Sequence, residues 1–299
     1  MHIPVLLNES IEGLNLKVGG TYVDCTVNRA GHSEKIAEKI GKNGTLICID
    51  LDQDSLAYAS EKLKQIKNHP HLHFIHSNFR YLPTVLESLN ISSVDGILAD
   101  LGLSSNELDV SGRGFSFRFD EPLQMTFNAR PTDDMTTAYE IVNSWGEETI
   151  ADILFGFADE RYAKRIAQAI VRNREEKKIK TTFELRDIIA NAVPALYRHK
   201  KTHFATKTFQ ALRMAVNDEL GSITDLINSL PNILNKEGRA CIITFHSTED
   251  RIVKKLFRDN GETLKIINKK AIVGSDEEIK NNTRARSAQL RIAEKYEAL

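Results

Sequence analysis

The amino-acid sequence predicts an α/β fold in which an open, mainly parallel sheet is interrupted by an all-helical insertion. Over roughly the first hundred residues, short apolar runs alternate with segments of helical periodicity, which is the pattern of βαβ units. From Thr136 to Ala195 the apolar residues recur at helical spacing, and no strand pattern is found. Strand character returns at residues 239–245, so we expect the sheet to continue after the insertion.

Four strands are expected before the insertion. Leu56, Ala59, Leu63 and Ile66 recur at the spacing of one helix face, which predicts a helix over residues 53–66. The expected strands are residues 22–26, 45–50, 72–76 and 94–100, and another helix is expected over residues 33–40.

The second half of the chain supplies the remaining elements. Residues 108–119 are polar and contain Gly112 and Gly114, which indicates a loop. After the insertion we expect a helix over 206–220, a strand over 239–245, a helix over 249–258, an apolar run at 264–267 and an edge strand over 287–293. The prediction is thus a discontinuous core, residues 1–107 and 206–299, and a substrate-binding helical domain, residues 108–205.

The composition indicates a globular protein of the cell interior. Of the 299 residues, 41% are hydrophobic and 27% are charged, and no apolar run reaches the length of a membrane span. The N-terminus lacks the basic region of a signal peptide. Cys25, Cys48 and Cys241 lie in apolar runs and form no Cys-x-x-Cys pair, so we expect buried thiols in a reducing cytoplasm.

Two basic segments contrast with the net charge of −1. Residues 161–180 contain eight Lys or Arg and two acids, and residues 198–213 contain five Lys or Arg and no acid. Such segments are commonly solvated helix faces. Two of them close together in the sequence also fit a surface that binds nucleic acid, and the sequence leaves both interpretations open.

Residues that directly follow the strands are candidates for a ligand site, because ligands bind at the carboxyl ends of parallel strands. After the first strand, Ala30 and Gly31 would let backbone N–H groups approach a ligand at a helix N-terminus. The loop lacks the glycine spacing of dinucleotide sites and the lysine of a phosphate-binding loop, which disfavours NAD and ATP. A tight turn without a ligand explains this loop equally well.

Three further strand ends carry side chains suited to an adenosine ligand. Asp50 could accept hydrogen bonds from both ribose hydroxyls, and Asn78 and Phe79 could lie near adenine. Asp100 places a carboxylate at the centre of the crevice. A solvated acid explains Asp50 and core packing explains Phe79 as well, but four such positions in register favour a ligand site.

Ten segments over nearly the whole chain carry a family resemblance: residues 2–7, 24–26, 31–33, 95–102, 113–118, 205–213, 216–220, 243–247, 249–254 and 284–288. In this order they resemble the bacterial 16S ribosomal RNA (cytosine-N4)-methyltransferase family. The resemblance implies a Rossmann-like class I methyltransferase sheet and S-adenosyl-L-methionine as cofactor. It also implies N4-methylation of a decoding-centre cytidine in 16S rRNA of the small ribosomal subunit, a helical insertion that helps to hold the rRNA, and homodimers.

The resemblance further implies a set of cofactor contacts, which are Ala30, Gly31, His32, Asp50, Phe79, Asp100 and Glu107. The chain departs from the family pattern at several positions. The family has glycines where Asn28 and Ala30 stand and glutamine where Glu107 stands. Gln124 and Asn128 replace two acids of the family, which puts any role of those acids in doubt.

The expected chemistry assigns a catalytic role to Asp100. The exocyclic nitrogen of cytosine is a poor nucleophile until an acceptor holds its N–H groups, and Asp100 or a neighbouring backbone carbonyl is the candidate acceptor. Related amino-methyltransferases have two prolines after this position, whereas Leu101 and Gly102 follow it here, so the assignment rests on position.

Other residues have two open interpretations. Phe115, Phe117 and Phe119 alternate near Arg113 and could stack on a flipped base, but the same alternation is typical of a buried face. His246 could lie near the substrate or bond to the local backbone, and no cluster shows metal-ligand spacing. The rival functions are a class I methyltransferase with another substrate and a non-catalytic ribosome assembly factor.

Overall fold

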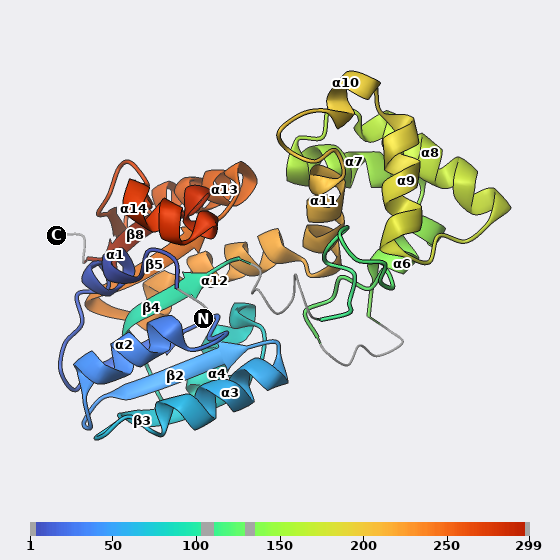
Figure 1. The fold of residues 1–299 in the computed structure, drawn as a ribbon. Helices are drawn as coiled ribbons and strands as arrows, with labels where there is room; N and C mark the ends of the chain where they lie inside the picture. Colours follow the sequence, from blue (N-terminus) through green and yellow to red (C-terminus); the bar gives the residue numbers. More distant parts are fainter. Residues whose placement is uncertain (1–3, 103–110, 129–134, 297–299) are drawn as a thin grey trace. The chain divides into compact units, whose positions relative to one another are not determined.

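The computed structural model describes residues 4–102, 111–128 and 135–296, and the chain divides into two compact units. The sheet unit comprises Met1–Gly102 and Leu220–Leu299, and the helical unit comprises Leu103–Glu219. Figure 1 follows the chain through both units.

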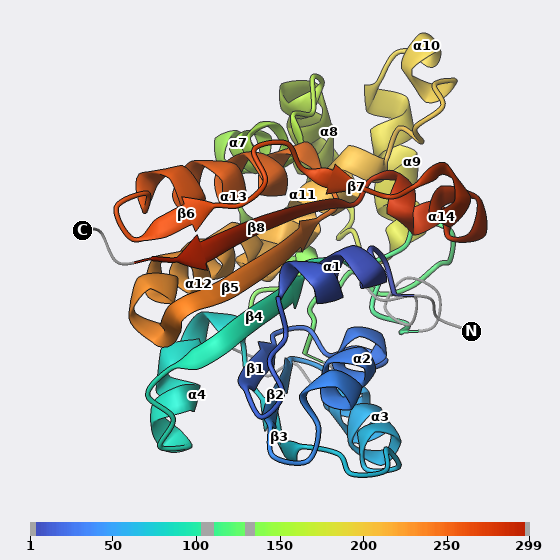
Figure 2. The same ribbon diagram turned by 90° about the vertical axis from the view of Figure 1, so that its left-hand side faces the viewer.

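The sheet unit is built on one eight-stranded sheet, ordered β3-β2-β1-β4-β5-β8-β6, with β7 also paired to β8 (Figure 2). Its parallel strands are β1 Thr21–Asp24, β2 Thr45–Asp50, β3 His71–His76, β4 Val94–Asp100 and β5 Leu234–Thr244. The antiparallel partners are β6 Leu264–Ile266, β7 Ile272–Val273 and β8 Gln289–Lys295. The predicted open α/β sheet is therefore confirmed.

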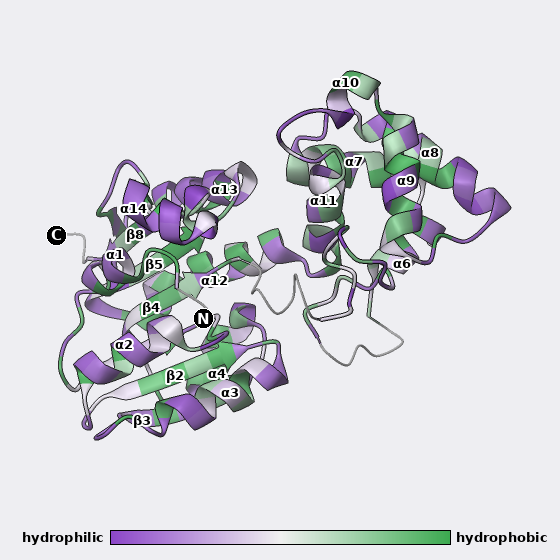
Figure 3. Ribbon diagram, in the orientation of Figure 1, coloured by the Kyte–Doolittle hydropathy of each residue, from purple (hydrophilic) through white to green (hydrophobic). Residues whose placement is uncertain are grey.

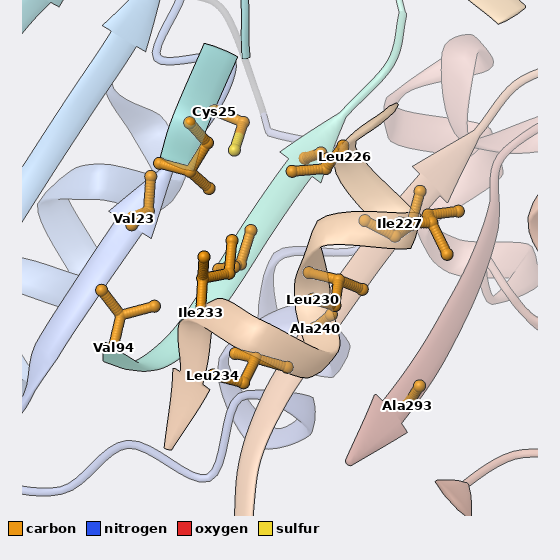
Figure 4. Packing of buried hydrophobic residues seen from close by; sticks show 14 of the residues in the cluster. Val23, Cys25, Val94, Leu226, Ile227, Leu230, Ile233, Leu234, Ala240 and Ala293 are labelled. Atoms are coloured by element: carbon orange, nitrogen blue, oxygen red, sulfur yellow. The ribbon is translucent and has the colours of Figure 1, made fainter. Parts of the chain in front are cut away.

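Helices cover both faces of the parallel strands, and the central parts of these strands, as in β2 and β4, are therefore mainly apolar. One face packs on α4 Leu82–Ser88, α12 Glu219–Ile233 and α13 Ser247–Asp259, and the other on α1 Leu7–Gly13, α2 Gly31–Ile40 and α3 Gln53–Leu63. Figure 4 shows the first core, and Figure 3 shows β2 and β4 as mainly hydrophobic while α2 and α3 alternate. The shorter elements of this unit are η1 Phe79–Tyr81, α14 Asp276–Asn281 and η2 Thr283–Arg286.

The prediction of an edge strand at residues 287–293 was wrong. Strand β8 lies inside the sheet, with β5 on one side and β6 and β7 on the other. The alternation of polar and apolar residues had indicated an edge strand, because Arg291 interrupts the apolar residues. Arg291 is instead buried, and its Nε and Nη2 donate to the carboxylate of Asp250 on α13 at 2.6 and 2.9 Å.

The helical unit packs around a core of its own. Its helices are α6 Ala138–Ser144, α7 Glu147–Ala158, α8 Ala163–Glu176, α9 Thr182–Ala192, α10 Ala195–Arg198 and α11 Thr206–Val216. Thr181 begins α9 with a capping box, since its hydroxyl accepts from the Glu184 amide and the Glu184 carboxylate accepts from the Thr181 amide.

The boundary at which the chain returns from the helical unit to the sheet unit differs from the predicted one, which was between residues 205 and 206. Phe209 and Leu212 of α11 are buried in the core of the helical unit, so the boundary falls after Glu219. The single helix predicted over residues 206–220 is also divided, because Asp218 has a left-handed backbone with φ 44° between α11 and α12.

The cysteine prediction is confirmed, since Cys25, Cys48 and Cys241 are all buried free thiols. Within the described ranges, no helix has the length and apolar character needed to span a bilayer.

Candidate functional site

The carboxyl ends of β1, β2, β3 and β4 lie side by side, because these strands are parallel neighbours in the sheet. This arrangement brings the predicted strand-end residues Asp50, Phe79 and Asp100 and the loop after β1 to one edge of the sheet. The edge is the position at which open α/β sheets bind ligands.

The loop from β1 to α2 adopts a backbone that favours glycine. Asn28 and Ala30 have φ values of 45° and 54°, in the left-handed region. These are the two positions at which the related family has glycines, so the family pattern has a backbone explanation. A side chain on Gly31 would place its Cβ 2.2 Å from Cγ of Pro4, so only glycine fits there.

Asp50 holds this loop. Its Oδ2 accepts from the amide of Asn28 at 2.9 Å, and its Oδ1 accepts from the amide of Asp52 at 2.9 Å. A carboxylate can accept several hydrogen bonds at once. Asp50 therefore anchors the loop and is a group of the kind that accepts hydroxyl donors.

The residues after β3 combine core packing with partial exposure. Phe79 is half-buried against the core that also contains Leu82. The side chain of Asn78 accepts from the amide of Arg80 at 3.0 Å and donates to Ser222 Oγ at 3.1 Å. The side-chain amide of Asn78 thus holds η1 in place. Phe79 packs against the core and stays partly exposed.

Asp100 carries the most unusual group at this edge. Its Oδ1 is inaccessible to solvent and has no hydrogen-bond partner among the described residues, although the residue as a whole is only partly buried. Its backbone amide donates to Thr26 Oγ1 at 2.7 Å. Burial raises the pKa of the carboxyl from 3.8 to about 6; His32 and Arg284 lower that pKa, and Asp24 and Glu249 raise it.

Asp24 is a second buried acid, but its partners come from the protein. Its carboxylate accepts from Ser33 Oγ at 2.5 Å and from the amide of Thr26 at 3.2 Å. Burial raises its pKa to about 6 against the lowering effect of these two hydrogen bonds. Asp24 therefore fixes the loop, whereas Asp100 presents an unpaired oxygen.

The two histidines have local partners. Nε2 of His32 lies 3.0 Å from the carbonyl of Val5, and burial lowers its pKa, which favours a neutral ring that donates this bond. His246 caps α13, where its Nδ1 accepts from the amide of Glu249 at 3.3 Å. The expectation of a bond to the local backbone is thus met for His246.

Sequence reasoning missed two residues beside Asp100. Thr26 accepts the Asp100 amide, and Arg284 is near enough to affect its pKa. Both lie in family-like segments, which is the signal that could have identified them. Glu107, the remaining predicted cofactor contact, lies outside the described residues.

The aromatic segment of the helical unit is structural in two of its three phenylalanines. Phe115 is buried and stacks on Phe127 at 5.6 Å, and Phe117 stacks on His203 at 4.3 Å. Arg113 is also buried and donates to the carbonyls of Thr126 and Phe127. Phe119 is 46% exposed, so it alone keeps the open face that base stacking requires.

The first basic segment divides into two groups. Lys177 pairs with Glu184 at 2.6 Å, while Arg174 and Lys178 donate to the carbonyls of Val142 and Asn143. Arg165 and Arg172 instead line a pocket. Arg165 and Arg172 therefore differ from Arg174, Lys177 and Lys178, whose side chains are bonded within the unit.

The site has the features of an adenosine site that also takes a positive charge. Asp50 offers acceptors for a diol, and the amides at the start of α2 can meet an anionic group. A cation beside Oδ1 of Asp100, which is buried and has no hydrogen-bond partner among the described residues, would offset its desolvation.

The family model of the MraW methylase family matches residues 1–296 of this chain. Three similar curated proteins carry the name Ribosomal RNA small subunit methyltransferase H. They come from Clostridioides difficile (strain 630), Finegoldia magna and Brevibacillus brevis, at 44%, 44% and 42% identity, and each alignment covers 98% of this chain and 98% of the relative.

We expect the buried carboxyl of Asp24 to lower stability as pH rises. Its folded-state pKa of about 6 exceeds the ordinary 3.8, so its contribution is full below about pH 4 and is lost as pH rises through 6. The free energy of unfolding of Asp24→Asn should therefore increase relative to that of the wild type across this window, by about 2–3 kcal/mol. Urea unfolding of both proteins from pH 4 to 7 measures the difference. A difference that stays constant with pH would contradict the assignment.

Proposed function

Because the chain belongs to the MraW methylase family, we propose that it transfers the methyl group of S-adenosyl-L-methionine to N4 of a decoding-centre cytidine in 16S rRNA. The observation that carries the proposal is Oδ1 of Asp100 at the carboxyl end of β4, which is buried and has no hydrogen-bond partner in the part of the chain that the structure describes. The names of the relatives, which specify ribosomal RNA of the small subunit, support the substrate.

Residues at three strand ends would hold the cofactor. We assign the ribose hydroxyls to the carboxylate of Asp50 and the adenine to the exposed side of Phe79. The methionine carboxylate is assigned to the backbone N–H groups of Gly31 and His32, where the N-terminus of α2 favours negative charge. Ala30 contributes as the N-cap that positions them, since its own N–H donates to the carbonyl of Val27 at 2.6 Å. His32 contributes through its backbone in this assignment, since its Nε2 is engaged by Val5.

When bound, S-adenosyl-L-methionine supplies an electrophilic methyl group on a positively charged sulfur. The chain must then bring the acceptor nitrogen into line with it, which is a problem of positioning. A carboxylate at Asp100 can accept an N–H of the cytosine amine and favour the positive charge that develops on the nitrogen during attack. The hydrogen bond from the Asp100 amide to Thr26 fixes the backbone of this residue.

The target base must leave its stack in the RNA to reach this edge. We assign the remaining RNA contacts to the helical unit, which is the predicted substrate-binding domain. The amides Gln124 and Asn128, which replace acids of the family, belong to that unit. We also infer from the family resemblance that the protein acts as a homodimer in the cytoplasm.

Removal of the Asp50 carboxylate should weaken cofactor binding. Asp50→Ala would leave ribose hydroxyls without acceptors and release Asn28, so we expect a loss of about 2–3 kcal/mol in the affinity for S-adenosyl-L-methionine. Calorimetry measures it. Asp52→Ala is the matched control, because Asp52 caps α3 and its loss should cost about 1 kcal/mol of stability with little change in affinity. Equal affinities for all three proteins would remove Asp50 from the site.

Loss of the Asp100 charge should slow catalysis. Asp100→Asn keeps the shape of the side chain, so we expect turnover to fall roughly a hundredfold to a thousandfold. The assay supplies small ribosomal subunits from cells that lack this gene and identifies N4-methylcytidine by nucleoside mass spectrometry. Cofactor affinity is measured in parallel, so that weaker binding can be separated from slower transfer.

Three results would contradict these assignments. Normal turnover in Asp100→Asn would assign the acceptor to a backbone carbonyl. Methylation by the wild type at carbon 5 or at a ring nitrogen would rule out the amine mechanism. Cofactor binding without any rRNA product would favour an assembly factor or another methyl acceptor.

A further inference from the structure

We propose that the helical unit contains a separate RNA site, a pocket between α8 and α9 that binds one unpaired nucleotide through its phosphate and its base edge. This inference rests on the proposed function, since it requires RNA as the substrate. The pocket has a volume of about 290 Å³, just below the range of about 300–1,000 Å³ for ligand pockets. That size suits a single nucleotide.

The walls of the pocket come from facing stripes on two helices. On α8, Arg165 and Arg172 are seven residues apart with Gln168 between them, so they lie along one face. On α9, Ile188 and Asn191 supply the opposite wall. The pocket is therefore fixed by helices that pack on the core of the unit.

The two arginines have the properties of phosphate ligands. Both are exposed. In the described part of the chain no acid forms an ion pair with either of them. The guanidinium of Arg165 also lies 5.9 Å from the centre of the Tyr162 ring. The lining set contains no acidic side chain. Arginine binds phosphate through a planar pair of N–H donors, so the positive charge of this pocket is available to an RNA backbone.

The amides of the pocket can recognise a base. Gln168, Asn173 and Asn191 each offer both a donor and an acceptor, which matches the hydrogen-bonding edge of an unstacked base. Nδ2 of Asn173 uses one N–H to donate to the carbonyl of Ala169 at 2.8 Å, so its second N–H and its Oδ1 are left for a ligand. Ile188 provides apolar surface for the ring.

The test compares charge and amide variants in binding to small ribosomal subunits from cells that lack this gene, at several salt concentrations. Arg172→Gln should weaken binding and reduce the log–log salt slope by about 0.7–0.9, the value for one lost phosphate contact. Asn191→Ala should weaken binding about threefold to tenfold without changing the slope. Lys164→Gln, an equal charge change on the same helix but outside the pocket, should change neither.

Two outcomes would overturn the proposal. If Arg172→Gln and Lys164→Gln behave alike, the pocket is not a phosphate site. If Asn191→Ala binds as the wild type does, no base is recognised and the nucleotide site is wrong. Formation of N4-methylcytidine by the wild type is scored separately, so failure of the pocket and failure of the proposed function give different results.

Discussion

The constraint on which the site depends is the burial of two carboxylates at the ends of parallel strands. The sheet is covered on both faces, so the carboxyl group of Asp24 and Oδ1 of Asp100 are removed from water, and the pKa values of both residues rise to about 6. Hydrogen bonds from Ser33 Oγ and from the amide of Thr26 offset the burial of the Asp24 carboxylate. It leaves Oδ1 of Asp100 without such a partner among the described residues. This difference separates an acid that builds the loop from one that can receive a ligand.

The loop between the two acids links the fold to the chemistry. Asp24 and Asp50 both accept backbone amides from it, and this holds Asn28 and Ala30 in left-handed conformations that cost energy for residues other than glycine. The amides at the start of α2 are thereby presented at the same edge as Asp100. The helical unit has a separate core and a separate polar pocket, so recognition of RNA and transfer of the methyl group are assigned to different parts of the chain.

Local patterns in the sequence predicted the sheet strands, the acids at their ends and the buried cysteines, because periodicity and strand-end position are local properties. Non-local pairing was not predictable. Arg291 made β8 look solvated because its partner Asp250 lies on another element. The periodicity of α11 indicated an apolar face but not which core would cover it. The unpaired state of Asp100 Oδ1 likewise depends on packing around it, so the sequence could give only its position.

The most direct test of the central claim is the affinity for S-adenosyl-L-methionine as a function of pH. A cationic ligand favours the ionised carboxylate of Asp100, whose pKa in the free protein is about 6. The dissociation constant of the wild type, measured by calorimetry from pH 5 to 8, should therefore rise as pH falls below 6, by up to about tenfold per pH unit. Asp100→Asn should lack this dependence. Parallel curves for the two proteins would contradict the claim that the buried carboxylate of Asp100 receives the methyl donor.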